Sequence, residues 1–417
     1  MMKNNTMLLL LISASVTVVS SLPTSAPKSI HLPLKNTKHS TFGKRSLLAS
    51  NKIPLINDLD LCEMAVKVQI GTPAQEFFLL FDTGSADTWI PSQQCTTETG
   101  CPDFLHHYDT KASSSYHELD NDTLSITYGI GSADGHYFED IVSLGGEYTN
   151  IKQTLATIDK AAGPISYQNQ SSDVDNVFLD GIFGAGLPAG TVRYLQGGEI
   201  YDPLIVALYK SKIIPNPVFS VSIAQDAAEG SVILGDVHQG YDYLYTPALG
   251  PRWSAYITEF QFQTANETKN FQFNQRTPFG IDTGSNFMYL PVPLAASLAK
   301  SITQNATLNQ EKTGIYVVDC QFQDSQDLVK ILFPSSQDSN KSIYITIPVK
   351  ELISKRESDG QCLLLFLPSN DKFILGNMLL RHFITVYDFG GTVPRIGFAP
   401  VNSNVADSAN KFLNELL

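Results

Sequence analysis

Short alternations of apolar and polar residues run through most of the chain, broken by Gly, Pro, Asn and Ser. This period-two pattern is typical of strands with one buried face, and its clearest instances are residues 66–70, 124–128 and 342–347. Helical spacing is confined to a few stretches, near residues 203–212, 294–303 and 377–383. The pattern predicts an all-β protein with few short helices.

The first residues of the chain do not follow this pattern. Lys3 precedes a short apolar run from Met7 to Leu22, and small residues follow it. This arrangement is typical of a secretory signal peptide, which we assign to residues 1–26. A buried core helix is the weaker alternative, because nothing amphipathic follows the run. We therefore expect a secreted, extracellular protein without a membrane anchor.

Residues 27–45 form a basic strip that contains no acidic residue and ends at the dibasic pair Lys44-Arg45. Its other basic residues are Lys28, Lys35 and Lys38. We interpret the strip as a removable pro-segment, against the alternative that Lys44-Arg45 is a solvated charge pair. Cleavage after Arg45 would leave 22 basic and 41 acidic residues, a net charge of 22 − 41 = −19.

Composition narrows the class of protein. The 417 residues suffice for two packed lobes, and only 17% are charged while 10% are aromatic, which excludes a disordered tail or a coiled coil. The net charge of −13 would repel phosphate backbones, so we expect no nucleic-acid partner.

The five cysteines suit an exported protein. Cys95 and Cys101 flank a short polar loop and are expected to form a local disulfide, and Cys320–Cys362 could close a longer loop. Cys62 is left over, and we interpret it as a small buried hydrophobic residue rather than a reactive thiol. Glycosylation sequons, which predict exposed loops, occur at Asn121, Asn169, Asn266, Asn305 and Asn340.

The most informative feature is an internal duplication. Residues 81–85 (FDTGS) recur as 281–285 (IDTGS), 200 residues later. Each copy is followed by an apolar segment with a proline and, farther on, by an apolar pair before glycine, at Gly184 and Gly376. The separations from Asp to that glycine are 102 and 94 residues, so both halves keep similar spacing.

Chemistry gives a reason for two such copies. Two carboxylates within hydrogen-bond reach cannot both ionise cheaply, so Asp82 and Asp282 would share one proton at acidic pH. One member could take a proton from a bound water while the other polarises a carbonyl. We expect the glycines to allow close backbone approach and the hydroxyls to orient the carboxylate oxygens. These supporting residues are Thr83, Gly84, Ser85, Thr283, Gly284 and Ser285.

The two DTGS motifs, DGIFG at 180–184 and FILGN at 373–377 resemble the pepsin-like aspartic proteases over about residues 58–400. Within that family, segments 135–138, 177–184 and 386–390 resemble the fungal mucor rennins. The resemblance implies two β lobes related by a pseudo-dyad, with a cleft between them for an extended peptide. The lobes would span residues 46–238 and 239–403, followed by a tail at 404–417.

The resemblance also implies the roles of individual residues. Asp82 and Asp282 match the catalytic pair, and Tyr128, with Gly129, Ile130 and Gly131, matches the tip of a flap that closes over the peptide. Trp89 matches the tryptophan that hydrogen-bonds the flap tyrosine; plain core packing is the alternative. The apolar Ile130 favours hydrophobic or aromatic substrate residues around the scissile bond.

The implied activity is that of a monomeric aspartic endopeptidase acting on proteins at acidic pH, with the pro-segment as an intramolecular inhibitor. The rival is a catalytically inactive peptide-binding or inhibitor protein on the same fold. We find no cofactor motif and no metal site, and we expect His106-His107 to lie in a solvated loop.

Overall fold

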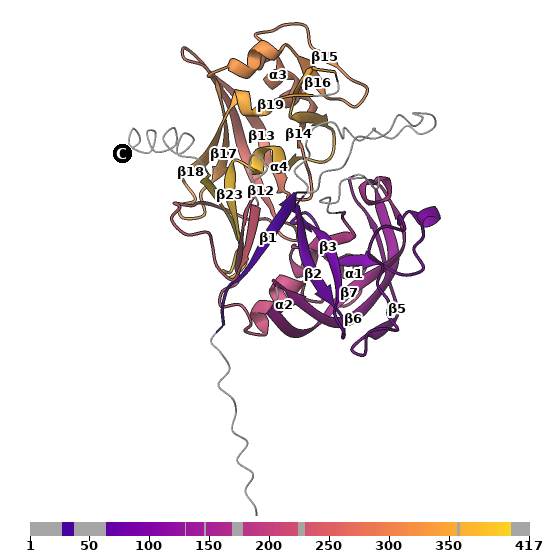
Figure 1. Cartoon of the computed structure of the whole chain (residues 1–417). Coiled ribbons are helices and arrows are strands. Elements are labelled where there is room, and N and C mark those ends of the chain that lie inside the picture. Colours follow the sequence, from indigo (N-terminus) through magenta and orange to yellow (C-terminus); the bar gives the residue numbers. More distant parts are fainter. Residues whose placement is uncertain are drawn as a thin grey trace, which may run out of the picture.

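The computed structural model describes residues 27–36, 64–129, 131–145, 147–168, 178–223, 230–356 and 359–401. Within these ranges strands dominate, and the N-terminal and C-terminal halves form two bodies that meet near β1 (Figure 1). The expected all-β, two-lobed architecture is confirmed.

Strands were predicted correctly at the three alternating segments, and helices at all three helical stretches. The structure adds one short helix that the pattern did not predict, α1. The helices are α1 (Val192–Leu195), α2 (Leu204–Lys210), α3 (Val292–Ile302) and α4 (Asn377–Leu380).

The largest sheet contains strands from both halves of the chain. In spatial order its strands are β11 (Leu244–Pro247), β24 (Arg395–Pro400), β23 (Phe383–Asp388), β9 (Val218–Ser222), β10 (Gly230–Leu234), β1 (Ile30–Asn36), β2 (Met64–Ile70), β3 (Gln75–Asp82), β8 (Gly181–Gly184), β4 (Trp89–Pro91), β7 (Glu147–Ala162), β6 (Ser132–Leu144) and β5 (His117–Thr127).

Two smaller sheets belong to the C-terminal half. The seven-stranded sheet comprises, in order, β18 (Ser342–Pro348), β17 (Leu328–Pro334), β12 (Ser254–Gln263), β13 (Thr268–Ile281), β22 (Ile374–Leu375), β14 (Met288–Pro291) and β21 (Phe366–Ser369). The four-stranded sheet comprises β15 (Asn309–Gln310), β16 (Tyr316–Val318), β20 (Cys362–Leu364) and β19 (Ile353–Lys355).

Strand β1 lies in the segment that we interpret as a pro-segment. It pairs with β10 along Ile30–Leu34 and with β2 at Lys35 and Asn36, and so connects two parts of the largest sheet. Its inward side chains Ile30, Leu32 and Leu34 are buried in the main core. Residues 30–36 are therefore an integral strand of this form of the chain.

Aromatic side chains join the two halves in the core. Phe219 of β9 stacks on Tyr387 of β23 at 4.7 Å between ring centroids, and Trp253 packs edge-on against both. All three are almost fully buried. Burial of such large rings is a major source of stability where strands from distant parts of the sequence meet.

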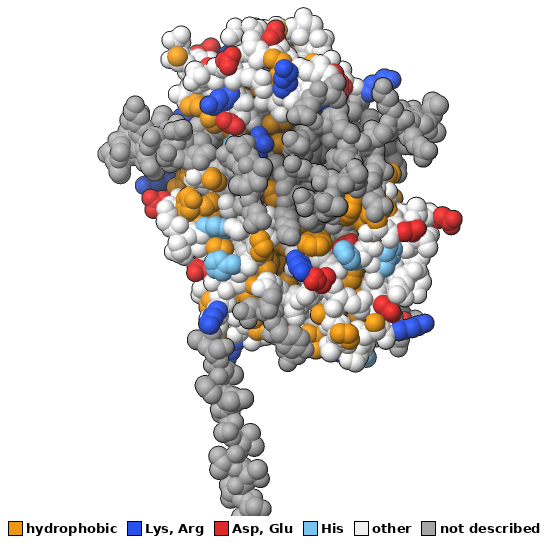
Figure 2. Space-filling view, viewed as in Figure 1, with side chains coloured by type: hydrophobic (Ala, Val, Ile, Leu, Met, Phe, Trp, Pro, Cys, Tyr) orange, Lys and Arg blue, Asp and Glu red, His pale blue; other side chains and the backbone are white. Residues whose placement is uncertain are grey.

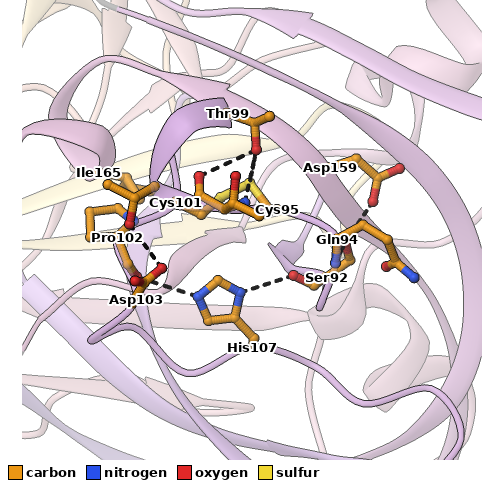
Figure 3. Close-up of a disulfide and its surroundings, with 12 residues drawn as sticks. Ser92, Gln94, Cys95, Thr99, Cys101, Pro102, Asp103, His107, Asp159 and Ile165 are labelled. Atoms are coloured by element: carbon orange, nitrogen blue, oxygen red, sulfur yellow. Dashed lines mark hydrogen bonds between the residues drawn. A yellow bond between two sulfur atoms is a disulfide. The ribbon is translucent and has the colours of Figure 1, made fainter.

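Both expected disulfides are present, Cys95–Cys101 and Cys320–Cys362. Around the first, the His107 ring lies within hydrogen-bond distance of the carbonyl oxygens of Ser92 and Pro102, at 2.9 and 3.3 Å (Figure 3). These contacts fix the Cys95–Cys101 loop against β4.

His106 has a different partner, the buried carboxylate of Asp180. Its ring Nδ1 lies 3.0 Å from Asp180 Oδ2, and the same carboxylate accepts hydrogen bonds from the backbone N–H groups of His106 and Phe78. The expectation of a solvated loop is thus incomplete, because both histidine rings have partners. Among the described residues, no group of three or more His, Cys, Asp or Glu side chains could hold a metal ion.

Charged side chains are dispersed over the visible surface. On the face shown in Figure 2, Lys and Arg side chains lie singly among acidic and uncharged ones. No helix in the described ranges has the length and apolar character needed to cross a membrane. The predicted signal peptide, Lys44-Arg45, Cys62 and the tail at 404–417 lie outside the described residues.

The His106–Asp180 pair predicts a pH dependence of stability. The hydrogen bond to Asp180 raises the pKa of His106 above its ordinary 6.5, against a smaller lowering by burial. A raised pKa in the folded state stabilises the fold below about pH 6.5, and this contribution is lost as pH rises through the higher folded value. The melting temperature of His106→Gln should therefore fall below that of the wild type by more at pH 5 than at pH 8. Equal differences at both pH values would contradict this assignment.

Candidate active site

The two aspartates lie at equivalent positions of two similar strand arrangements. Asp82 ends β3, which runs parallel to β8, and Asp282 directly follows β13, which runs parallel to β22. In each half a short third strand is antiparallel to the second strand of the pair. β4 pairs with β8 in the first half, and β14 pairs with β22 in the second. The duplicated sequence thus folds into a duplicated local structure.

Two threonines lock these loops together. The Thr83 hydroxyl donates to the Ile281 carbonyl at 2.8 Å and accepts from the Thr283 backbone N–H at 3.0 Å. The Thr283 hydroxyl does the same in reverse, donating to the Phe81 carbonyl at 2.6 Å and accepting from the Thr83 N–H at 3.1 Å. All four bonds are buried, so each loop holds the other in place.

Each carboxylate is oriented by its own loop. Asp82 Oδ1 accepts a hydrogen bond from the Gly84 N–H at 2.7 Å, and Oδ2 accepts one from the Ser85 hydroxyl. Asp282 has the same two partners in its loop, the Gly284 N–H at 2.8 Å and the Ser285 hydroxyl at 2.7 Å. The outcome for the serines agrees with the expectation from sequence.

The glycines allow the two halves to approach. A Cβ at residue 84 would lie 2.6 Å from the carboxylate carbon of Asp282, and one at residue 284 would lie 2.4 Å from Asp82 Oδ1. Both distances are too short for any side chain. Each glycine therefore makes room for the carboxylate of the opposite loop rather than for its own.

The electrostatics of the pair differ from those of isolated carboxylates. Burial, together with the negative charge of Asp282 and a hydrogen bond between the two side chains, raises the pKa of Asp82 to about 8. Asp82 is only 5% exposed. Since one carboxylate of a contacting pair retains its proton, the site can offer a proton donor and a proton acceptor side by side.

The flap hairpin lies beside this pair. Strands β5 and β6 are joined through Tyr128, whose N–H donates to the Gly131 carbonyl at 3.0 Å. Trp89 donates from Nε1 to the Tyr128 hydroxyl at 2.6 Å, the contact that the family resemblance implies for this tryptophan. Ile130 lies outside the described residues.

The structure differs from the sequence expectation in one respect and adds two residues. The hydroxyls of Thr83 and Thr283 cross to the opposite backbone instead of orienting the carboxylates. Tyr289 is near Asp282, where burial and that charge raise its pKa to about 12. Asp87 is fully buried five residues after Asp82, and only its place just after the first motif could have drawn attention to it.

Comparison with known proteins supports the family that the motifs suggest. A family model described as eukaryotic aspartyl protease matches residues 63–401. The chain is 38% identical to mucorpepsin of Rhizomucor miehei over 87% of this chain and 84% of that protein. It is 38% identical to mucorpepsin of Rhizomucor pusillus, over 84% and 81% respectively. Identity to pepsin A of Bos taurus is 28%, over 84% and 86%.

The threonine interlock can be tested with Thr83→Val, which keeps the shape but removes the hydroxyl. The Thr283 N–H would lose its acceptor in a buried site, at a cost of about 1–3 kcal/mol in the free energy of unfolding. Urea denaturation measures this cost. Thr277→Val, at a surface position of β13, is the control and should change stability by no more than about 0.5 kcal/mol. Equal effects of the two substitutions would contradict the interlock.

Proposed function

The chain belongs to the eukaryotic aspartyl protease family and is an aspartic endopeptidase, and from this premise we propose that it is a secreted enzyme that hydrolyses proteins at acidic pH through Asp82 and Asp282. The observation that carries the proposal is the symmetric contact of the two carboxylates across the interlocked loops. The geometry places two carboxyl groups in contact, so that they can hold one proton between them.

The proposed reaction uses one water and no covalent intermediate. Burial and the neighbouring carboxylate raise the pKa of Asp82, so the pair retains one proton at acidic pH. We assign this proton to Asp82 and the role of proton acceptor to Asp282. Asp282 takes a proton from the water while the water oxygen bonds to the peptide carbonyl carbon. At the same time Asp82 gives its proton to the carbonyl oxygen. As the resulting gem-diol breaks down, Asp282 gives the proton it took from the water to the amide nitrogen, and one hydroxyl of the gem-diol returns a proton to Asp82 as its C=O bond re-forms. The C–N bond breaks, which leaves an acid and an amine and restores the starting protonation of the dyad.

We further propose that the peptide binds in extended form between the dyad and the flap. Tyr128, at the tip of the flap, is linked through its hydroxyl to Trp89, which follows the Asp82 loop. An extended peptide presents backbone groups to a hairpin in the manner of an added strand. The preference for hydrophobic or aromatic residues rests on Ile130 in the sequence alone.

Secretion, processing and the monomeric state are also part of the proposal. Two disulfides suit an oxidising compartment, and the start of the chain has the pattern of a signal peptide. Residues 30–36 form an integral strand beside β2 and β10. This pairing supports a pro-segment that is bound by the body of the protein, as an intramolecular inhibitor would be.

The rival function, an inactive binding protein on this fold, lacks a supporting observation. Proteins of that kind would be expected to lose part of the catalytic constellation. Here Asp82, Gly84, Tyr128, Asp282 and Gly284 are all in place.

The decisive experiment compares the processed protein with its Asp82→Asn and Asp282→Asn variants on casein at acidic pH. Each variant should fold, yet lose at least about 1000-fold in kcat, because half of the proton transfer machinery is removed. Wild-type activity should decline as pH rises above neutrality, because the dyad then loses the proton that the raised pKa of Asp82 retains at lower pH. It should be blocked by a statine-containing peptide and unaffected by a chelator.

Substantial activity in a purified Asp82→Asn variant would overturn the dyad assignment. A folded wild-type protein that cleaves no protein substrate at any acidic pH would favour the rival function.

A further inference from the structure

Asp87 is a second buried carboxylate in the loop that follows Asp82, and it has no part in the reaction described above. Its side chain is inaccessible to solvent. Oδ1 accepts hydrogen bonds from the hydroxyls of Tyr137 and Tyr201, both at 2.7 Å, and Oδ2 accepts one from the Val192 N–H at 2.8 Å. Both carboxylate oxygens are thus occupied by donors from distant parts of the sequence.

These donors come from three separate elements. Tyr137 lies on β6, one of the two flap strands, and Val192 begins α1. Tyr201 lies between α1 and α2, and its ring packs edge-on against Tyr137 with centroids 5.9 Å apart. Asp87 therefore holds a flap strand and α1 against the catalytic loop.

The second flap strand is connected to the same point through α1. Arg193 forms an ion pair with Asp122 of β5, at 2.8 Å between Nη2 and Oδ2. Both side chains are largely or partly shielded from solvent, which strengthens such a pair relative to a fully exposed one. Each strand of the flap hairpin is thus linked to Asp87, β6 directly and β5 through α1.

Asp87 lies between the aspartate proposed to act on the substrate and the tryptophan that contacts the flap tip. Asp82 lies five residues before it and Trp89 two residues after it. Trp89 holds the Tyr128 hydroxyl, so a displacement of this loop would move the dyad and the flap tip together.

We propose that Asp87 is a positioning residue for catalysis, which fixes the catalytic loop relative to both strands of the flap so that Tyr128 closes in register with the dyad. The proposal rests on the proposed function of Asp82 and Asp282. Small displacements of catalytic groups cost large factors in rate, about 100-fold for 1 Å. The expected signature is therefore a loss in kcat rather than only a loss of stability.

Burial explains why three donors are needed. Burial raises the pKa of Asp87, and the hydrogen bonds from Tyr201, Val192 and Tyr137 oppose that rise. Removal of the acceptor would in turn leave two phenol hydroxyls and a backbone N–H without this partner inside the lobe.

The chain offers a matched control in Asp140. This aspartate is equally buried on β6 and also accepts from a tyrosine hydroxyl (Tyr108), a serine hydroxyl (Ser115) and a backbone N–H (Ile141). Its partners tie β6 to the segment around residues 108–115, not to the catalytic loop. A substitution at Asp140 should therefore cost stability without changing the rate at each folded site.

The test compares the wild type, Asp87→Ala and Asp140→Ala, with active sites counted by titration with a statine-containing peptide. We expect kcat per titrated site to fall by about ten-fold or more in Asp87→Ala, with KM changed less than kcat, and to stay within two-fold of wild type in Asp140→Ala. Asp87→Asn, which keeps an acceptor oxygen at the same place, should recover most of the lost kcat.

A second variant keeps the proposal testable if Asp87→Ala does not fold. The double substitution Tyr137→Phe/Tyr201→Phe removes both phenol donors but retains both rings, and it should also lower kcat per titrated site. Normal kcat in this double variant and in any folded Asp87→Ala would overturn the positioning role. Failure of the proposed function looks different, because the wild-type protein itself would then show no proteolysis.

Discussion

The four crossing hydrogen bonds of Thr83 and Thr283 are the constraint on which the rest of the site depends. Each hydroxyl uses both its donor and its acceptor capacity on the opposite loop, so a shift of either loop would disrupt all four buried hydrogen bonds. The contact of Asp82 with Asp282 follows from this interlock, because each aspartate precedes one of the threonines. The two halves of the chain are thereby joined at the point where the two carboxylates meet.

The largest sheet also joins the two halves of the chain. Strand β9 of the first half pairs with β23 of the second, and β10 pairs with β9 and, through β1, is connected to β2. Phe219, Trp253 and Tyr387 pack where these strands meet. Continuous pairing and packing of this kind limit movement of one half of the chain relative to the other.

Much of this could be predicted from the sequence because the motif occurs twice. A repeated Asp-Thr-Gly-Ser indicates two equivalent loops, and chemistry explains why a reaction needs both carboxylates. The role of the threonines could not be predicted, since a hydroxyl next to a carboxylate gives no sign that it reaches across to the other loop. The contacts of Asp87 and His106 could not be predicted for a similar reason. Their partners Tyr201 and Asp180 are 114 and 74 residues away in the sequence, and no local pattern indicates contacts over such separations.

Several independent features of the chain agree with the proposed activity at acidic pH. The pKa of Asp82 is raised because burial and a neighbouring carboxylate disfavour its charge, and the ion pair of His106 with Asp180 exists only while the imidazole is protonated. Acidic residues outnumber basic ones by 41 to 28, so repulsion among carboxylates weakens as pH falls. The proposed catalysis, the pair of His106 with Asp180 and the overall charge thus favour the same side of neutrality. The proposed reaction requires one proton that is shared between two aspartates. The repulsion among the other carboxylates is smallest in the same acidic range in which that proton is retained, so stability and catalysis have the same pH requirement.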